Sequence, residues 1–328
     1  MSYQIQPLKE FLVRPALPAA LSRLSEIAYN LIWSWDHTIR SVFRRLDPVL
    51  WKECNHNPVQ LLGRIPQEKL DRAAADPRFL LLYKRACERH DSYLHSSTPT
   101  DATPKIAYFS MEYGLLDCMQ IYSGGLGLLS GDHLKAASDG DFALAGVGLL
   151  YQRGYLQQHL NPDGWQQERT PLNDFYTLPV RPCTGPKGEE VIVSVHLPTG
   201  EVFIKVWHID VGRVKLYVLD TNIPQNKSAE HREITDQLYG GDIHKRIRQE
   251  IVLGIGGLRA LKALGISPTV HHMNEGHSAF QAIERVRVLM HEEKLTLEQA
   301  LEATRVSNVF TTHTSVPAGI DLFDSAMV

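Results

Sequence analysis

The feature that most constrains this chain is a glycine-rich turn between a predicted strand and a predicted helix, in the segment YSGGLGLLSGDHLKAASD at residues 122–139. Before it, residues 106–110 (IAYFS) are apolar and aromatic, as in a buried strand. After it, residues recur at helical spacing: Leu128, Leu129, His133, Ala136 and Ala137. A strand, a turn and a helix in this order aim free backbone N–H groups at an anion.

The turn itself contains Ser123, Gly124, Gly125 and Gly127. Glycine removes the Cβ that would keep a ligand away from the amides and would disfavour positive φ. No Gly-Lys-Ser/Thr follows the turn, and the spacing is G-G-x-G, so neither a P-loop nor a dinucleotide fingerprint is present. The alternative interpretation is a tight strand-to-helix turn whose glycines allow close backbone packing.

Composition limits the classes of protein that this chain can represent. Its 328 residues contain 43% hydrophobic and 22% charged residues, and the net charge is −3. This balance argues against a general binder of nucleic acid or of membrane surfaces. The N-terminal sequence MSYQIQPLKEFLVRP lacks an apolar signal core, which predicts a cytoplasmic protein. Four scattered cysteines without a CxxC pair predict buried free thiols.

Residues 1–96 are predicted to be helical, with an amphipathic stripe at 18–35 and short helices broken at Pro48 and Pro58. Trp33, Trp35 and Trp51 cluster there, either as packing between helices or as a sugar-stacking surface. Residues 96–104 (SSTPTDATP) form a polar, proline-bearing linker. It predicts one domain at residues 1–96 and another at 105–328.

The second region alternates strand-like and helix-like segments, which predicts an α/β fold. A continuous apolar run at 142–151 is typical of a strand buried on both faces. Three strand-like runs then suggest a β-rich excursion (191–196, 201–209 and 214–219). A long helix at 244–264 follows. The series ends with a strand at 269–273, helices at 276–291 and 297–307, and a strand at 308–312.

Polar side chains follow two of these predicted strands. Asn274, Glu275 and His277 come after one, and His313 comes after the other. Parallel sheets place ligands at the carboxyl ends of their strands, so we expect these residues and the glycine turn to converge on one cleft. Turn and capping roles are the alternative.

A metal site is a rival interpretation of the same region, because His271, His272, Glu275 and His277 offer four ligands in seven residues. The order is not H-E-x-x-H, however. His271 and His272 should point to opposite faces of a strand, which is poor ligand geometry. We therefore expect no metal there.

Several motifs together resemble the α-glucan (glycogen/maltodextrin) phosphorylases of the short bacterial and archaeal type. They are YFSMEYG (108–114), IYSGGLGLLSGDHLKAASD (121–139), GVGLLYQRGYLQQ (146–158), DGWQQE (163–168), HMNEGHSAF (272–280) and VFTTHTSVPAGID (309–321). Residues 1–96 resemble the helical segment that precedes the phosphorylase body. The likeness covers essentially the whole chain.

The resemblance implies a glycosyltransferase B fold with its active site between two Rossmann-like halves. That family transfers a terminal α-1,4-linked glucose to phosphate, giving glucose 1-phosphate, with pyridoxal 5′-phosphate acting through its phosphate group. This chain would then be a helical segment followed by one Rossmann-like half with a β-rich insertion. The C-terminal half, with the cofactor lysine and the phosphate-binding cations, has no counterpart before Val328. We therefore expect an incomplete enzyme that neither holds the cofactor covalently nor catalyses phosphorolysis alone.

The resemblance also implies roles for individual residues. His313 would contact the glucosyl unit, and the amides of Gly124 and Gly125 would approach the phosphate and sugar as catalytic groups. The substrate-binding residues would be Gly127, Asn274, Glu275, His277, Tyr239 and Asp242. Residues 239–242 (YGGD), ahead of residues 248–250, align with a mobile segment that gates the cleft. Ser315 departs from the family pattern, which usually has proline there.

Two other functions stay open at this point. One is a non-catalytic glucan-binding module that uses Trp165, Tyr239 and the N-terminal aromatics. The other is a metal-dependent hydrolase built on residues 271–277. An incomplete two-domain fold should also expose an apolar inter-domain face, which predicts self-association.

Overall fold

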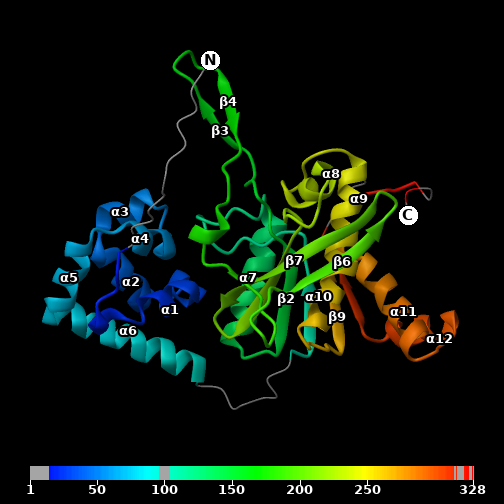
Figure 1. Cartoon of the computed structure of the whole chain (residues 1–328), viewed down its shortest axis with the longest axis horizontal. Helices are drawn as coiled ribbons and strands as arrows, with labels where there is room; N and C mark the ends of the chain where they lie inside the picture. The colour runs from blue at the N-terminus through cyan, green and yellow to red at the C-terminus, as the bar shows by residue number, and fades with distance from the viewer. Residues whose placement is uncertain (1–14, 96–103, 314, 316–320, 325–326, 328) are drawn as a thin grey trace.

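The computed structural model describes residues 15–95, 104–313, 315, 321–324 and 327 (Figure 1). The predicted linker at 96–104 lies outside these residues except for Pro104. The division into domains at 1–96 and 105–328 therefore stays a prediction. The buried apolar residues form one continuous core that runs through both parts.

The N-terminal part is a helical unit, as predicted. Its elements are η1 (Ala19–Leu21), α1 (Leu24–Tyr29), η2 (Leu31–Ser34), α2 (His37–Leu46), α3 (Pro48–Glu53), α4 (Pro58–Arg64), α5 (Gln67–Ala75) and α6 (Pro77–His95). Pro48 and Pro58 open helices, and the side chains of Asp47 and Asn57 cap them. Trp33 and Trp51 are buried between these helices, which is the packing role.

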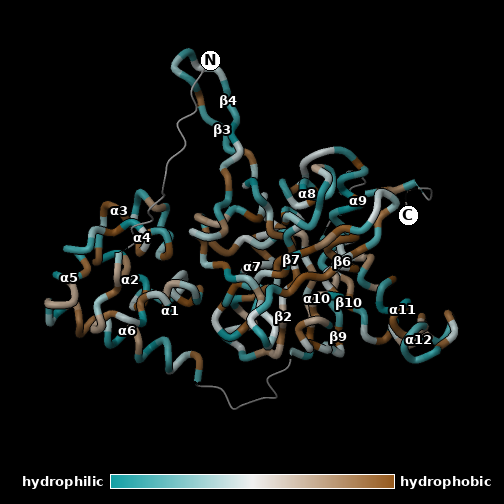
Figure 2. Tube along the Cα trace, in the orientation of Figure 1, coloured by the Kyte–Doolittle hydropathy of each residue, from teal (hydrophilic) through white to brown (hydrophobic). Residues whose placement is uncertain are grey.

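The second part is built on an eight-stranded mixed sheet. Its strands are β1 (Ile106–Phe109), β2 (Leu144–Leu149), β5 (Arg181–Pro182), β6 (Ile192–Leu197), β7 (Gly200–Val211), β8 (Val214–Asp220), β9 (Val270–Asn274) and β10 (Asn308–Thr311). Their order is β10-β9-β1-β2-β8-β7-β5, with β6 also paired to β7. The strands from β10 to β8 are parallel, whereas β5, β6 and β7 are antiparallel. Hydrophobic residues gather along the strands (Figure 2).

The β-rich segment therefore differs from the predicted insertion. It continues the central sheet, because β8 pairs with β2 in parallel and β7 pairs with β8. The part that leaves the sheet is a hairpin of β3 (Gln157–Leu160) and β4 (Gln166–Arg169), which projects from the body in Figure 1.

The remaining helices connect and cover these strands. They are α7 (Gly125–Asp139), η3 (Phe175–Thr177), α8 (Ala229–Arg232), η4 (Glu233–Thr235), α9 (Ile243–Ile251), η5 (Val252–Gly256), α10 (Gly257–Ala263), η6 (Gly276–Ser278), α11 (Phe280–Glu292) and α12 (Leu297–Arg305). The predicted long helix at 244–264 is α9, the π-helical η5 and α10 in succession. A Cβ on Gly254 would lie 2.5 Å from the Gln281 nitrogen, so glycine allows this helix to approach α11.

Hydrogen bonds join the helical unit to the sheet. The Asn30 amide both accepts from the Gly212 nitrogen at 3.1 Å and donates to the Gly212 oxygen at 3.0 Å. The Asn57 amide donates to the Thr177 carbonyl at 2.8 Å. All four cysteines are free, with Cys54 and Cys183 buried. None of the described helices is both long and apolar enough to cross a membrane.

Candidate functional site

The candidate site lies at the carboxyl ends of β1, β9 and β10, three neighbouring parallel strands. Residues that follow these strands are joined by hydrogen bonds. His313 Nε2 lies 2.8 Å from Asn274 Oδ1. Asn274 Nδ2 in turn lies 3.2 Å from Ser110 Oγ and 3.0 Å from Ser130 Oγ of α7. The predicted convergence of the strand ends is therefore present for His313, Asn274 and the helix that follows the glycine turn.

This network fixes the direction of each hydrogen bond. The hydroxyls of Ser110 and Ser130 donate to the carbonyls of Glu112 and Leu126, so they accept from the Asn274 amide nitrogen. The Asn274 oxygen must then accept from His313 Nε2. In the neutral imidazole the proton is on Nε2, which leaves Nδ1 as the acceptor.

Glu275 holds the backbone next to His313. Its carboxylate accepts from the His313 nitrogen, and the Thr312 hydroxyl lies 3.4 Å from each of its oxygens. The residue is buried and has a φ of 66°, a left-handed conformation that is uncommon for a side chain other than glycine. Strained backbone of this kind is concentrated at functional sites.

The glycine turn is held by a carboxylate of the chain itself. Glu112 Oε2 accepts from the Ser123 nitrogen at 2.7 Å and from the Gly124 nitrogen at 3.3 Å. The Tyr239 hydroxyl donates to Glu112 Oε1 at 2.6 Å. The turn thus binds an anion, as its sequence predicts, but part of the anion-binding geometry is occupied by Glu112. The first-turn amides of α7 that begin at Gly125 have no acceptor within the helix.

The glycines of this turn serve two different purposes. Gly124 is extended, with a φ of −154°, so its conformation does not require glycine. An added Cβ on Gly124 or Gly125 would meet no atom within 4 Å, which leaves space for a ligand. At Gly127 the Cβ would lie 2.5 Å from Tyr122 Cβ and 2.7 Å from Glu112 Oε2. Gly127, predicted as substrate-binding, is therefore required for packing.

Tyr239 and His277 belong to a second, mostly buried cluster beside the turn. Their rings lie 6.0 Å apart, and the Arg246 guanidinium lies 4.6 Å from the centre of the Tyr239 ring. Arg246 also forms an ion pair with Asp321. Burial, and after it the charge of Arg246, lowers the pKa of His277. Burial, and then the Glu112 carboxylate, raises the pKa of Tyr239.

Glu250 on α9 belongs to the same cluster. Burial, together with the nearby Asp321 carboxylate, raises its pKa to about 8. Buried side-chain atoms of this cluster have no hydrogen-bond partner among the described residues: Arg246 Nε, Glu250 Oε1 and His277 Nδ1. Such atoms are typical of groups that meet a ligand or water. Asp242 lies apart from them as the exposed N-cap of α9, where it accepts from the Lys245 nitrogen at 3.0 Å.

A cavity of about 480 Å³ lies beside His313 and Asn274. Tyr108, His133 and His272 line it as an aromatic group, with the Tyr108 ring 4.6 Å from His133 and 5.0 Å from His272. Burial lowers the pKa of both histidines. None of the described residues that line this cavity is Lys or Arg.

Histidines of the 271–277 segment have separate surroundings. His272 Nε2 lies 2.6 Å from the Thr311 hydroxyl, whereas burial lowers the pKa of His271 to about 3 and Arg285 adds to this. The group of potential metal ligands found within the described parts of the chain is Glu26, His90 and Asp91, in the helical unit.

Sequence reasoning missed the residues that organise the site from behind. Glu112 lies in the YFSMEYG motif directly after β1, so its place at a strand end was the available signal. Arg246 and Glu250 lie on the polar side of α9 and gave no signal. Ser110 and Ser130 are small residues within longer apolar segments.

Comparison with known proteins places this site in a context. The chain is 44% identical to "Glycogen phosphorylase" of Mycobacterium tuberculosis over 99% of its length, which is 39% of that protein. It is 42% identical to "Maltodextrin phosphorylase" of Thermococcus litoralis, covering 96% of this chain and 38% of the relative. It is also 36% identical to "Glycogen phosphorylase" of Aquifex aeolicus, covering 93% of this chain and 44% of the relative.

The chain thus spans less than half the length of these curated relatives. A family model described as "Protein of unknown function (DUF3417)" matches residues 17–119, which is the helical unit together with β1. The resemblance that the sequence motifs indicated is confirmed.

Proposed function

The chain is of the glycogen/maltodextrin phosphorylase type over nearly its whole length, and from this premise we propose that it carries one half of an α-1,4-glucan phosphorylase active site. The reaction is transfer of a terminal glucosyl unit to phosphate. The observation that carries the proposal is the hydrogen-bond network from His313 through Asn274 to Ser130 of α7. It holds a histidine next to a helix whose first amides lack acceptors.

In this proposal His313 recognises a glucosyl hydroxyl. Its Nε2 proton is held by Asn274, so Nδ1 accepts from a hydroxyl of the sugar. The amides at Gly124 and Gly125 face the phosphate and sugar, where their dipoles stabilise negative charge. Asn274 and Glu275 orient His313, while His277 and Tyr239 form the glucan side. Asp242, at the start of α9, belongs to the gating segment.

The described residues around His313 do not by themselves fit pyridoxal phosphate or a free phosphate ion. No Lys or Arg lines the described cavity, and Glu112 already occupies the Ser123 and Gly124 amides. We propose that the cations and the cofactor lysine belong to the part of the relatives' length that this chain does not span. We therefore expect no catalysis by this chain alone and no retained cofactor.

One observation favours a second candidate, a glucan-binding module without catalysis. Trp165, at the turn of the β3–β4 hairpin, is 72% exposed, as a sugar-stacking residue would be. Both candidates predict binding of α-glucan, and they differ in turnover and in the contribution of His313.

The test combines binding and turnover. Calorimetry with maltoheptaose should show binding that falls at least about tenfold in His313→Ala and stays unchanged in His291→Ala, an exposed histidine on α11. With phosphate and pyridoxal phosphate added, no glucose 1-phosphate should form. Equal affinity of His313→Ala and the parent chain would contradict the role of His313. Formation of glucose 1-phosphate would contradict the missing-cation argument.

A further inference from the structure

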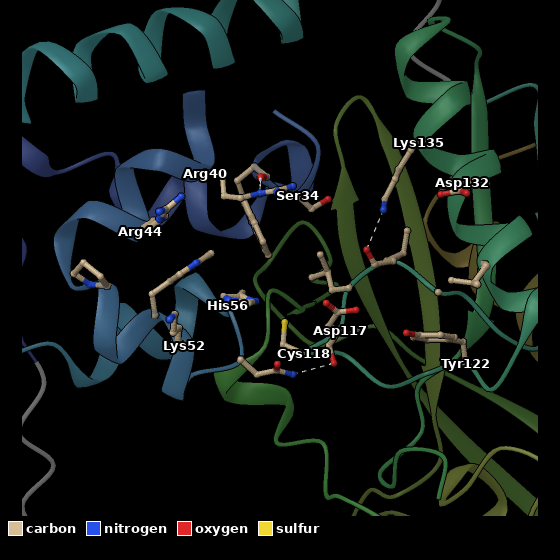
Figure 3. A pocket seen from close by; sticks show the side chains of 18 residues that line it. Ser34, Arg40, Arg44, Lys52, His56, Asp117, Cys118, Tyr122, Asp132 and Lys135 are labelled. Atoms are coloured by element: carbon tan, nitrogen blue, oxygen red, sulfur yellow. Dashed lines mark hydrogen bonds between the residues drawn. The ribbon is translucent and has the colours of Figure 1, made fainter. Parts of the chain in front are cut away.

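A second cavity, away from the site at the strand ends, lies between the helical unit and the sheet part. Its volume is about 660 Å³, within the roughly 300–1,000 Å³ usual for small-molecule sites. One wall comes from α2 and α3 and the turn that follows them. The other comes from residues 114–118, Tyr122 and α7 (Figure 3). Neither His313 nor Asn274 lines it.

Positive charge exceeds negative charge in this cavity. Arg40 and Arg44 of α2, Lys52 of α3 and Lys135 of α7 line it, against the two carboxylates of Asp117 and Asp132. Four cations less two anions leave an excess of two positive charges. Figure 3 shows cations on both sides of the space. An anionic ligand is therefore favoured over a neutral or cationic one.

The contacts of these cations leave the charges unpaired. Arg40 Nε donates to the Trp33 carbonyl at 3.1 Å, and Lys135 Nζ donates to the Leu115 carbonyl at 3.0 Å. Both acceptors are neutral. Arg44 and Lys52 are exposed and form no ion pair with any described residue. The side chains are thus available for a charge-assisted hydrogen bond to an oxyanion.

Aromatic residues of the cavity do not favour a glucan chain. Trp33 and Trp51 are each only 4% exposed, and Trp51 is stacked against Phe43 at 6.2 Å. Their faces are used in packing, so a sugar cannot stack on them. The exposed ring at the rim is His56, 5.4 Å from Trp51. One ring of a small ligand can rest there.

The turn that carries His56 has an unusual backbone. Asn55 and His56 have φ values of 48° and 59°, so two successive residues other than glycine are left-handed. The Asn55 amide donates to the Asp117 carbonyl at 3.2 Å, which ties one wall of the cavity to the other. This strain, of order 1–3 kcal/mol per residue, is retained where the turn defines the shape of the cavity.

We propose that this cavity binds a small molecule with a phosphate group on a ring, held by Arg44, Lys52 and Arg40 with its ring against His56. The site is distinct from the proposed catalytic half-site. Tyr122 lines it and directly precedes Ser123, whose nitrogen is bound to Glu112. A ligand there contacts the same segment that forms the glycine turn, so it can influence that turn.

The test is calorimetric titration of the full chain with four probes: glucose 6-phosphate, AMP, glucose and adenosine, with inorganic phosphate as a fifth. Phosphorylated probes should bind, and their unphosphorylated partners should bind at least about tenfold more weakly. Affinity should fall as salt rises, because the cations are exposed. Which of the two phosphorylated probes binds more tightly identifies the ring.

Adjacent arginines of α2 provide the matched control. Arg44→Gln should weaken binding of the tighter probe about tenfold or more, whereas Arg45→Gln, equally exposed but outside the cavity, should not. His313→Ala should leave this binding unchanged, which separates it from the catalytic half-site. Equal losses in the two arginine variants would overturn the proposal, as would equal affinity for glucose and glucose 6-phosphate. Binding abolished by His313→Ala would assign the phosphate to the other site.

Discussion

Glu112 is a buried carboxylate that joins three separate segments. One oxygen accepts from the Ser123 and Gly124 nitrogens, and the other accepts from the Tyr239 hydroxyl. Donors from the glycine turn and from the segment ahead of α9 therefore meet at one side chain. Since each bond involves a charged acceptor, each contributes more than a neutral hydrogen bond.

Replacement of Glu112 tests this arrangement at the level of one atom. Glu112→Gln keeps the shape but turns one acceptor oxygen into a donor facing other donors. The free energy of unfolding should fall by about 1–3 kcal/mol in urea denaturation. The matched control is Glu293→Gln at an exposed position, where a change within about 0.5 kcal/mol is expected. Similar values for the two variants would refute the bridging role.

Glu250 gives a pH dependence with a defined sign. The residue is 3% exposed, and burial with the nearby Asp321 raises its pKa to about 8 from 4.5. Between about pH 4.5 and 8 the folded chain keeps a proton that the unfolded chain has lost. The free energy of unfolding therefore decreases as pH rises through this window.

Glu250→Gln cannot lose that proton. Its stability relative to the parent chain should increase from pH 5 to pH 8, by up to about 1.4 kcal/mol per pH unit. Urea denaturation at pH 5, 6, 7 and 8 measures the difference. A difference that stays constant with pH would show that Glu250 titrates normally.

At the scale of elements, the start of α7 combines an open and a closed glycine. No atom lies within 4 Å of a Cβ added to Gly125, whereas one added to Gly127 would overlap Tyr122 and Glu112. The same substitution two residues apart should therefore have opposite effects.

Alanine substitution at both positions tests this contrast. Gly125→Ala should leave the free energy of unfolding unchanged or raise it by up to about 1 kcal/mol, since alanine lowers the entropy of the unfolded chain. Gly127→Ala should lower it by about 1–3 kcal/mol through overpacking. Denaturation of both variants under one condition provides the comparison. A loss at Gly125 as large as that at Gly127 would contradict the assignment.

Individual elements were predictable because their signals are local. The apolar runs of β1 and β2, the glycine turn and the spacing in α7 each lie within a few residues. Partner choice is not local. Strand composition identified β7 and β8, but only the pairing of β8 with β2 shows that they extend the sheet. Likewise, strand ends indicated His313 and Asn274, whereas Glu112 is a single carboxylate without a spacing pattern.

At the scale of the whole molecule, one apolar face is uncovered among the described residues. It consists of Ile283 of α11, Leu297 and Leu301 of α12, and Val309 and Phe310 of β10, which are 43–55% exposed. β10 is also an edge of the sheet. Exposed apolar patches on an edge strand favour association between chains.

We therefore expect concentration-dependent self-association through this face. Leu301→Glu, at a position 51% exposed, should shift sedimentation velocity profiles toward the monomer. The control is Leu81→Glu on α6, where leucine is 53% exposed but lies in the helical unit. Association that both variants reduce equally would locate the contact elsewhere, and a monomeric parent chain at all concentrations would refute the prediction.

The strand order has a consequence for synthesis on the ribosome. Residues 15–95 can form their helices as they emerge, because their contacts are close in sequence. β1 cannot complete its pairing at that stage: Ile106 pairs with Val270, far later in the chain. β1 therefore has one unpaired edge while the intervening residues are translated. During that interval nascent chains depend on the helical unit, or on chaperones, to shield an apolar strand.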